Sequence, residues 1–107
     1  MQVFEVQELP EFPYMNIKEV IEGKTVKDLL NNNNNQKSFL LVDHETKRIW
    51  MWNGPISSLK LQIYCGILAR KLRQQLRLFY RVYPLDMYSK EDKKYLEILE
   101  KKIATGL

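Results

Sequence analysis

The sequence has little of what enzymes and metal-binding proteins commonly use. Its 107 residues include a single cysteine, a single histidine and four glycines that do not cluster. One cysteine excludes a disulfide within the chain and any multi-cysteine metal site. Dispersed glycines exclude a glycine-rich phosphate-binding loop. We therefore expect neither an enzyme nor a bound cofactor or metal.

The cysteine and the histidine also lie in unpromising places for chemistry. Cys65 falls on the predicted core-facing side of a helix, where a thiol is buried and unreactive. His44 lies in a polar turn between Asp43 and Glu45, where we expect a solvated loop residue rather than a general base. No catalytic residue is predicted.

Long apolar segments are missing too. No run approaches the roughly 20 residues that a membrane helix requires. Glu5, Glu8 and Glu11 interrupt the start of the chain, where a signal peptide would need an apolar core. A chain of 107 residues has room for one hydrophobic core. We expect one soluble domain, residues 1–107, in the cytoplasm.

Two short apolar runs and a long helix form the centre of the chain. Ser38–Asp43 and Arg48–Asn53 are separated by a few polar residues, a pattern that predicts a β-hairpin. Four successive apolar side chains in the second run indicate a central strand. After Gly54, Pro55 suits the first position of a helix, and that helix is predicted to extend to Leu76.

Two apolar stripes follow this helix. At about 100° per residue, one stripe has the aliphatic and small side chains that pack against a sheet. It consists of Leu61, Cys65, Leu68, Ala69, Leu72 and Leu76. The second stripe lies roughly opposite and consists of Ile56, Leu59, Ile63 and Ile67, continuing into Arg70 and Gln74, with Lys60 and Lys71 on its flanks. Either another element of the domain covers the second stripe, or the stripe binds a partner.

Acidic residues are absent from a long central segment. Between positions 46 and 85 there are eight basic residues and no acid, whereas residues 1–45 carry eight acids and four lysines. The long helix therefore has a positive field that favours an acidic partner. An acidic protein and an anionic phospholipid surface both fit this charge. Nucleic acid is less favoured, because the chain has no nucleic-acid-binding motif that we can place.

The hairpin and the long helix together resemble the core of a gelsolin-like repeat. The resemblance is carried by the Phe-Leu-Leu-Val-Asp run ending at Asp43, by Ile-Trp-Met-Trp-Asn-Gly ending at Gly54, and by Cys65, Ala69 and Leu72. It implies an α+β fold, with a mixed sheet of about five strands packed between the long helix, about 55–76, and a C-terminal helix, about 89–104.

The other strands follow from residue pattern and resemblance together. Val3–Leu9 alternates weakly and is predicted as a first strand, at a sheet edge because of its charges. Residues 14–21 are ambiguous between strand and helix, and analogy with the family favours a strand. Leu78–Tyr83 supplies the strand that returns to the sheet after the long helix.

The remaining segments are helical ends or loops. Thr25–Leu30 fits a short helical turn, with Thr25 as its N-cap. Asn31–Asn35 is too polar to bury and is predicted as a loop. Ser89 is the expected N-cap of the C-terminal helix, and Gly106 its end.

Calcium binding is not expected. In many gelsolin-like repeats a Gly-Asp pair that enters the central strand and a glutamate on the long helix hold calcium. Lys37 and Ser38 stand where that pair would be, and no carboxylate occurs from Pro55 to Leu76. A hard cation needs several oxygen ligands, usually including carboxylates.

The resemblance implies actin binding through the long helix, which in the family wedges into the hydrophobic cleft at the barbed end. We predict a protein that sequesters actin monomers or caps the barbed end independently of calcium. Its expected contact residues are Ile56, Leu59, Lys60, Ile63, Ile67, Arg70, Lys71 and Gln74. Phospholipids would then be regulators. The alternative is a gelsolin-fold adaptor, linked to a coat or a GTPase, that contacts proteins other than actin.

Overall fold

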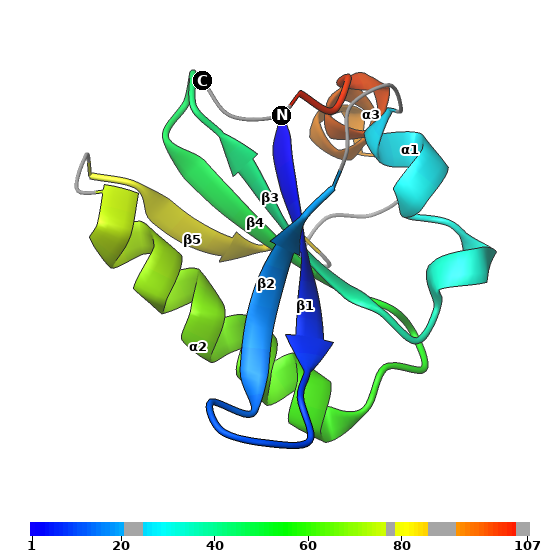
Figure 1. The fold of residues 1–107 in the computed structure, drawn as a ribbon. Helices are drawn as coiled ribbons and strands as arrows, with labels where there is room; N and C mark the ends of the chain where they lie inside the picture. Colours follow the sequence, from blue (N-terminus) through cyan, green and yellow to red (C-terminus); the bar gives the residue numbers. More distant parts are fainter. Residues whose placement is uncertain (21–24, 77–78, 86–91, 105–107) are drawn as a thin grey trace.

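A mixed sheet with helices on both faces makes up the computed structural model, which describes residues 1–20, 25–76, 79–85 and 92–104 (Figure 1). In these residues the strand order is β2-β1-β3-β4-β5. The strands are β1 (Gln2–Glu8), β2 (Met15–Glu19), β3 (Ser38–Asp43), β4 (Arg48–Asn53) and β5 (Arg81–Pro84). The helices are α1 (Val26–Leu29), a 3₁₀ turn at Asn32–Asn34, α2 (Leu59–Leu76) and α3 (Lys93–Glu100).

The predicted hairpin forms the middle of the sheet. β3 pairs antiparallel with β4, with Leu41 opposite Trp50, and β5 returns parallel to β4 after the α2 crossover. The prediction that the first strand is a sheet edge is wrong, because β1 pairs with β2 on one side and β3 on the other. One of its charges is accommodated by an ion pair, which joins Glu5 to Lys37 at 3.6 Å.

Side chains alternate between two hydrophobic cores, one on each face of the sheet. Leu40 and Val42 of β3 pack toward α2 and its buried residues Leu61, Cys65, Leu68, Ala69 and Leu72. Phe39 and Leu41 pack on the other face with residues of α1 and α3. Figure 1 shows α2 on one side of the sheet and α1 with α3 on the other. The predicted α+β architecture and the predicted core stripe of the long helix are confirmed.

The long helix begins later than the sequence predicted. Pro55 lies outside α2, because the backbone from Gly54 to Ser57 forms a turn in which the Ser57 N–H and hydroxyl both donate to the Gly54 carbonyl. Ser58 then accepts a hydrogen bond from the Leu61 N–H on its side-chain oxygen at 3.0 Å, which makes it the N-cap. Leu59 is the first helical residue.

That turn rests on the asparagine-rich segment. The Ile56 N–H donates to the Asn35 carbonyl at 3.1 Å, and the Gly54 N–H donates to the Lys37 carbonyl at 2.8 Å. A Cβ on Gly54 would lie 2.0 Å from the Asn35 carbonyl oxygen, so only glycine fits this contact. The predicted loop is therefore a hydrogen-bonded turn that fixes where α2 starts.

The caps of the short helices agree with the sequence for α1 and differ for α3. Thr25 is the N-cap of α1, as predicted, and its hydroxyl and N–H both donate to the Asp28 carboxylate, while the Asp28 N–H bonds to the Thr25 carbonyl. Asp92 is the N-cap of α3 and accepts from the Lys94 N–H at 2.9 Å. The predicted helix over about 89–104 is too long, because Asp92 is still extended and α3 ends at Glu100, with Lys101 as its C-cap. The predicted cap Ser89 and the predicted end Gly106 themselves lie outside the described residues.

Candidate interaction surface on the long helix

The second stripe is at the surface. Ile56 is 63% exposed, Leu59 72% and Ile63 53%, while Ile67 is half-buried. Leu59, Ile63 and Ile67 lie along the side of α2 that faces away from the sheet, and Ile56 belongs to the turn before the helix. Within the described residues no other element covers Ile56, Leu59 and Ile63, so the first of the two alternatives does not hold for these three, whereas Ile67 is partly covered.

The predicted polar contact residues surround this stripe. Lys60, Arg70, Lys71 and Gln74 are all exposed on α2. The Lys60 ammonium lies 5.7 Å from the centre of the Tyr64 ring, a cation–π distance. Since α2 contains no acid at all, its cations have no partner of opposite charge along the helix. The helix thus presents apolar side chains inside a basic border.

A second group of exposed apolar side chains lies on the β1–β2 connection, where no sequence pattern had indicated a site. Phe12 is 85% exposed and Tyr14 51%. Their rings meet edge to face, with centroids 6.1 Å apart. In the sequence, Phe12 and Tyr14 flank Pro13 next to the predicted first strand, and that pattern alone does not show whether the two rings are buried or exposed.

The histidine is not the solvated loop residue that the sequence predicted. His44 is half-buried, and its Nε2 donates to Gln2 Oε1 at 2.8 Å while its Nδ1 pairs with the Tyr80 hydroxyl. The Gln2 amide in turn donates to Glu19, which fixes which Gln2 atom faces the ring. Burial, followed by the charge of the chain's amino terminus, lowers the pKa of His44, and Asp43 opposes this change. Both ring nitrogens of His44 are thus engaged in hydrogen bonds within the domain.

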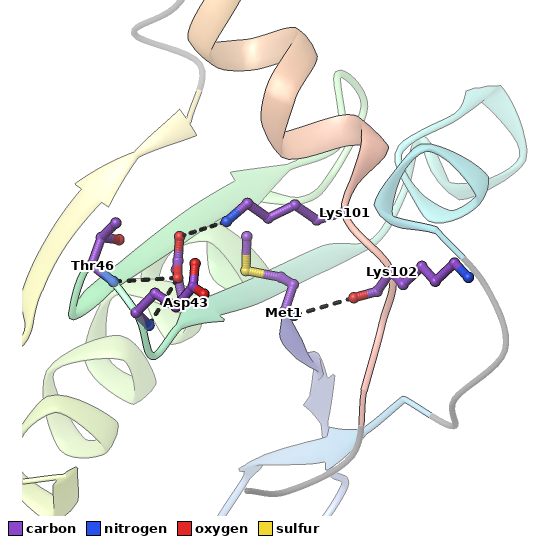
Figure 2. A network of polar contacts seen from close by, with 6 residues as sticks. Met1, Asp43, Thr46, Lys101 and Lys102 are labelled. Atoms are coloured by element: carbon purple, nitrogen blue, oxygen red, sulfur yellow. Dashed lines mark hydrogen bonds and ion pairs between the residues drawn. The ribbon is translucent and has the colours of Figure 1, made fainter.

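Next to His44 is a cavity of about 370 Å³, lined by Met1, Asp43 and Lys101 among others. Figure 2 shows how this region is held: Lys101 points at Asp43, Thr46 approaches from the β3–β4 turn, and the Met1 amino group meets the Lys102 carbonyl. The Thr46 bond closes the β3–β4 turn, the Lys101 bond joins β3 to the residue after α3, and the Met1 bond joins the start of the chain to the segment after α3. The polar groups beside this cavity therefore hold segments of the domain together.

Lys37 and Ser38, which stand where the resemblance would place a Gly-Asp pair, make other contacts. Ser38 is buried, and its hydroxyl donates to Asn53 Oδ1 at 2.6 Å across the β3–β4 pair. Lys37 beside it is paired with Glu5. In the part of the chain that the structure describes, no three His, Cys, Asp or Glu side chains are grouped to hold a metal ion.

The described helices include none that is both long and apolar enough to cross a membrane. The sequence matches no protein-family model and no curated protein. Among solved structures, the fold is similar to Thorarchaeota ProGel in a crystal structure of its complex with rabbit actin. The TM-score is 0.63 at 19% identity, and the match covers 92% of this chain and 97% of that one.

A second solved structure shows the same likeness. Thorarchaeota 2DGel3, also in a crystal structure of a complex with rabbit actin, matches with a TM-score of 0.55 and 18% identity over 92% of this chain. The match covers 44% of 2DGel3, so this chain spans less than half of that protein's length. The sheet order, the crossover helix and these matches agree with the resemblance seen in the sequence. The chain has the fold of a gelsolin-like domain.

Proposed function

We propose that this chain is an actin-binding protein and that the exposed face of α2 is its contact surface. The observation that carries the proposal is the exposure of Leu59 and Ile63, two large aliphatic side chains one turn apart on a helix of a gelsolin-like fold. Two proteins with a similar fold have been crystallised with actin. Because fold alone does not determine function, the weight of the proposal rests on this surface.

The size of the apolar contact is adequate for useful affinity. Burying an exposed Leu or Ile side chain contributes about 1.5–3 kcal/mol. A micromolar complex requires about 8 kcal/mol after association costs are subtracted. Leu59, Ile63 and Ile56 would supply part of this amount, and the remainder has to come from the border of the contact.

The basic border favours actin over a neutral partner. Lys60, Arg70 and Lys71 are exposed and lie on an acid-free helix, so they attract an acidic surface during encounter. We expect these three residues to act mainly on the association rate. Their effect should weaken as salt is raised, since exposed charges are screened over about 10 Å at 0.1 M ionic strength.

We further propose that the domain sequesters actin monomers or caps the barbed end, in the cytoplasm, without calcium. Calcium independence is supported by Ser38 and Lys37, whose side chains are committed to Asn53 and Glu5. It is supported also by the absence of any carboxylate on α2. A lone domain of this kind should not sever filaments, because severing by gelsolin-like proteins relies on several linked repeats.

Polymerisation of pyrene-labelled actin tests both parts of the proposal. The protein should slow polymerisation equally in calcium and in chelator. Slowing at a small fraction of the actin concentration indicates capping, whereas slowing only near equimolar protein indicates sequestering. The variant Ile63→Asp should lose the effect, because a carboxylate cannot enter an apolar contact without a large desolvation cost.

Leu96→Asp is the matched control. Leu96 is 46% exposed on α3, on the other side of the sheet, so this variant adds the same charge to an exposed helical position. It should inhibit like the unmodified protein. If the unmodified protein has no effect on actin in either condition, the proposal is wrong, and an adaptor role that uses the same fold without actin takes its place.

A further inference from the structure

Exposed apolar side chains gather at one end of the sheet. β1 ends there at Glu8 and β4 at Asn53, while α2 begins there at Leu59. Within the described residues, the large hydrophobic side chains exposed at this end are Phe12, Tyr14, Ile56, Leu59 and Ile63. The structure describes two more exposed large hydrophobic side chains, Phe79 and Leu96, and neither lies at this end of the sheet.

The β1–β2 tip is constructed to hold its aromatic side chains in place. The Leu9 N–H donates to the Tyr14 carbonyl at 2.8 Å, and the Tyr14 N–H donates to the Glu11 carbonyl at 2.8 Å. Tyr14 has φ of 67°, which is rare for a bulky residue. Strain of this kind persists only where the surrounding structure imposes it, and it commonly accompanies a binding surface. The Phe12 ring packs edge to face on the Tyr14 ring.

A hydrogen bond ties this tip to the start of the long helix. Glu8 Oε1 accepts from the Ser58 hydroxyl at 3.1 Å, and the same Ser58 oxygen caps α2 by accepting from the Leu61 N–H. Figure 1 shows the β1–β2 connection beside the first turns of α2. This bond joins the end of β1 to the start of α2, so a partner that contacts the first turns of α2 also lies beside the β1–β2 connection.

The area of the helix face alone is small for a specific complex. A standard interface covers about 800 Å² on each partner. Three exposed aliphatic side chains and a half-buried one account for only part of that area, whereas two aromatic side chains add about 150–250 Å² each when fully buried. Aromatic residues are also the side chains most often found at the energetic centre of an interface.

We propose that Phe12 and Tyr14 form a second contact with actin, next to the α2 contact, so that a single partner covers both elements. This inference rests on the proposed function. The tip carries the acids Glu8 and Glu11, whereas α2 carries only basic residues, so the two contacts differ in charge. That difference fixes the orientation of the partner, because an acidic surface must face α2 and a basic one must face the tip.

Equilibrium binding of fluorescently labelled rabbit actin monomers to the full chain tests this inference. The double variant Phe12→Ser, Tyr14→Asn should weaken binding at least tenfold. The matched control is Phe79→Asn. Phe79 is also an exposed aromatic residue, 92% exposed with φ of 59°, but it precedes β5 at the opposite end of the sheet. The control should change the dissociation constant by less than twofold. Urea unfolding of each variant shows that it is folded.

The variant Ile63→Asp separates the two proposals. If Ile63→Asp abolishes binding while the tip variant binds within twofold of the unmodified protein, the helix contact stands and the tip contact is overturned. If the unmodified protein does not bind actin, both proposals are overturned. A photo-crosslinking amino acid at position 12 or at position 63 gives an independent test. A covalent product with actin from position 12 supports the tip contact. A product from position 63 but none from position 12 counts against it.

Discussion

The Nζ atom of Lys101 lies 3.2 Å from Oδ2 of Asp43, so the residue that follows α3 is ion-paired with the last residue of β3. The Asp43 side chain is 10% exposed, and its other oxygen accepts from the N–H groups of Glu45 and Thr46. One carboxylate therefore closes the β3–β4 turn and anchors the C-terminal segment (Figure 2).

Loss of the Lys101 side chain and loss of the Asp43 side chain should destabilise the fold by different amounts. Lys101→Met should lower the free energy of unfolding by about 1 kcal/mol, because Lys101 is partly exposed and the ion pair is partly screened. Asp43→Ala should cost roughly 2–3 kcal/mol, since it also leaves the turn N–H groups without their acceptor. Urea unfolding measures both. Lys102→Met, which removes the same charge from an exposed neighbour, should cost less than Lys101→Met, and an equal cost would show that the ion pair contributes nothing.

Stability should decline in two steps as the pH falls. Burial is the largest influence on the pKa of Asp43 and raises it, but the hydrogen bond and charge of Lys101, with bonds from Thr46, outweigh it and leave the pKa below 3.8. The pKa of His44 is lowered from 6.5, chiefly by burial. In both cases the unfolded chain takes up the proton first. The free energy of unfolding is therefore expected to fall below pH 6.5 because of His44, and again below pH 3.8 because of Asp43.

Variants assign each step to its residue. His44→Gln removes the titrating ring and should flatten the dependence of unfolding free energy on pH between 7 and the acid step. Asp43→Asn should instead reduce the second step. If the unfolding free energy of His44→Gln changes with pH near neutrality as it does in the unmodified protein, the burial of His44 does not cause that change.

Two glycines should respond in opposite ways to alanine. A Cβ on Gly54 would lie 2.0 Å from the backbone oxygen of Asn35, and backbone cannot move aside cheaply, so Gly54→Ala should cost roughly 1–3 kcal/mol or more. Gly66 lies within α2, where an added methyl group would meet nothing within 4 Å, so Gly66→Ala should add about 0.5–1 kcal/mol of stability. Thermal or urea unfolding distinguishes them. Equal effects of the two changes would contradict the contact between Gly54 and Asn35.

The Cys65 thiol should be unreactive in the folded protein. It is 0% exposed, and burial raises its pKa to about 12. Because the thiolate is the reactive form, Ellman's reagent at pH 8 should modify Cys65 only in denaturant. Reaction of the folded protein at the rate of a free thiol would show that α2 detaches from the sheet readily.

The sequence predicted the buried side of the fold better than its surface. The spacing of Leu61, Cys65 and Leu68 was enough to identify the face of α2 that packs on the sheet, because burial imposes a period on the chain. β1 was misjudged because Glu5 and Glu8 resemble the charges of an edge strand. Their partners, Lys37 and Ser58, come from distant segments and could not be identified from a local pattern.

The candidate contact surface was predicted in part for the same reason. Helical spacing grouped Leu59, Ile63 and Ile67, and the structure was needed to show that no described element covers Leu59 and Ile63. Phe12 and Tyr14 belong to a turn without periodicity, so nothing in the sequence placed them at the same end of the molecule. His44 lies in the predicted turn, but it was taken for a solvated residue because its partners, Gln2 and Tyr80, are far away in the chain.

Actin binding by the exposed face of α2 can be measured directly as the dissociation constant for labelled actin monomers. We expect a value near or below about 10 µM for the unmodified protein. Ile63→Asp combined with Ile67→Asp should weaken binding by more than about thirtyfold, about 2 kcal/mol, while Leu96→Asp binds like the unmodified protein. Unchanged binding by the double variant, or no binding of the unmodified protein at about 100 µM, would contradict the proposal that this face binds actin.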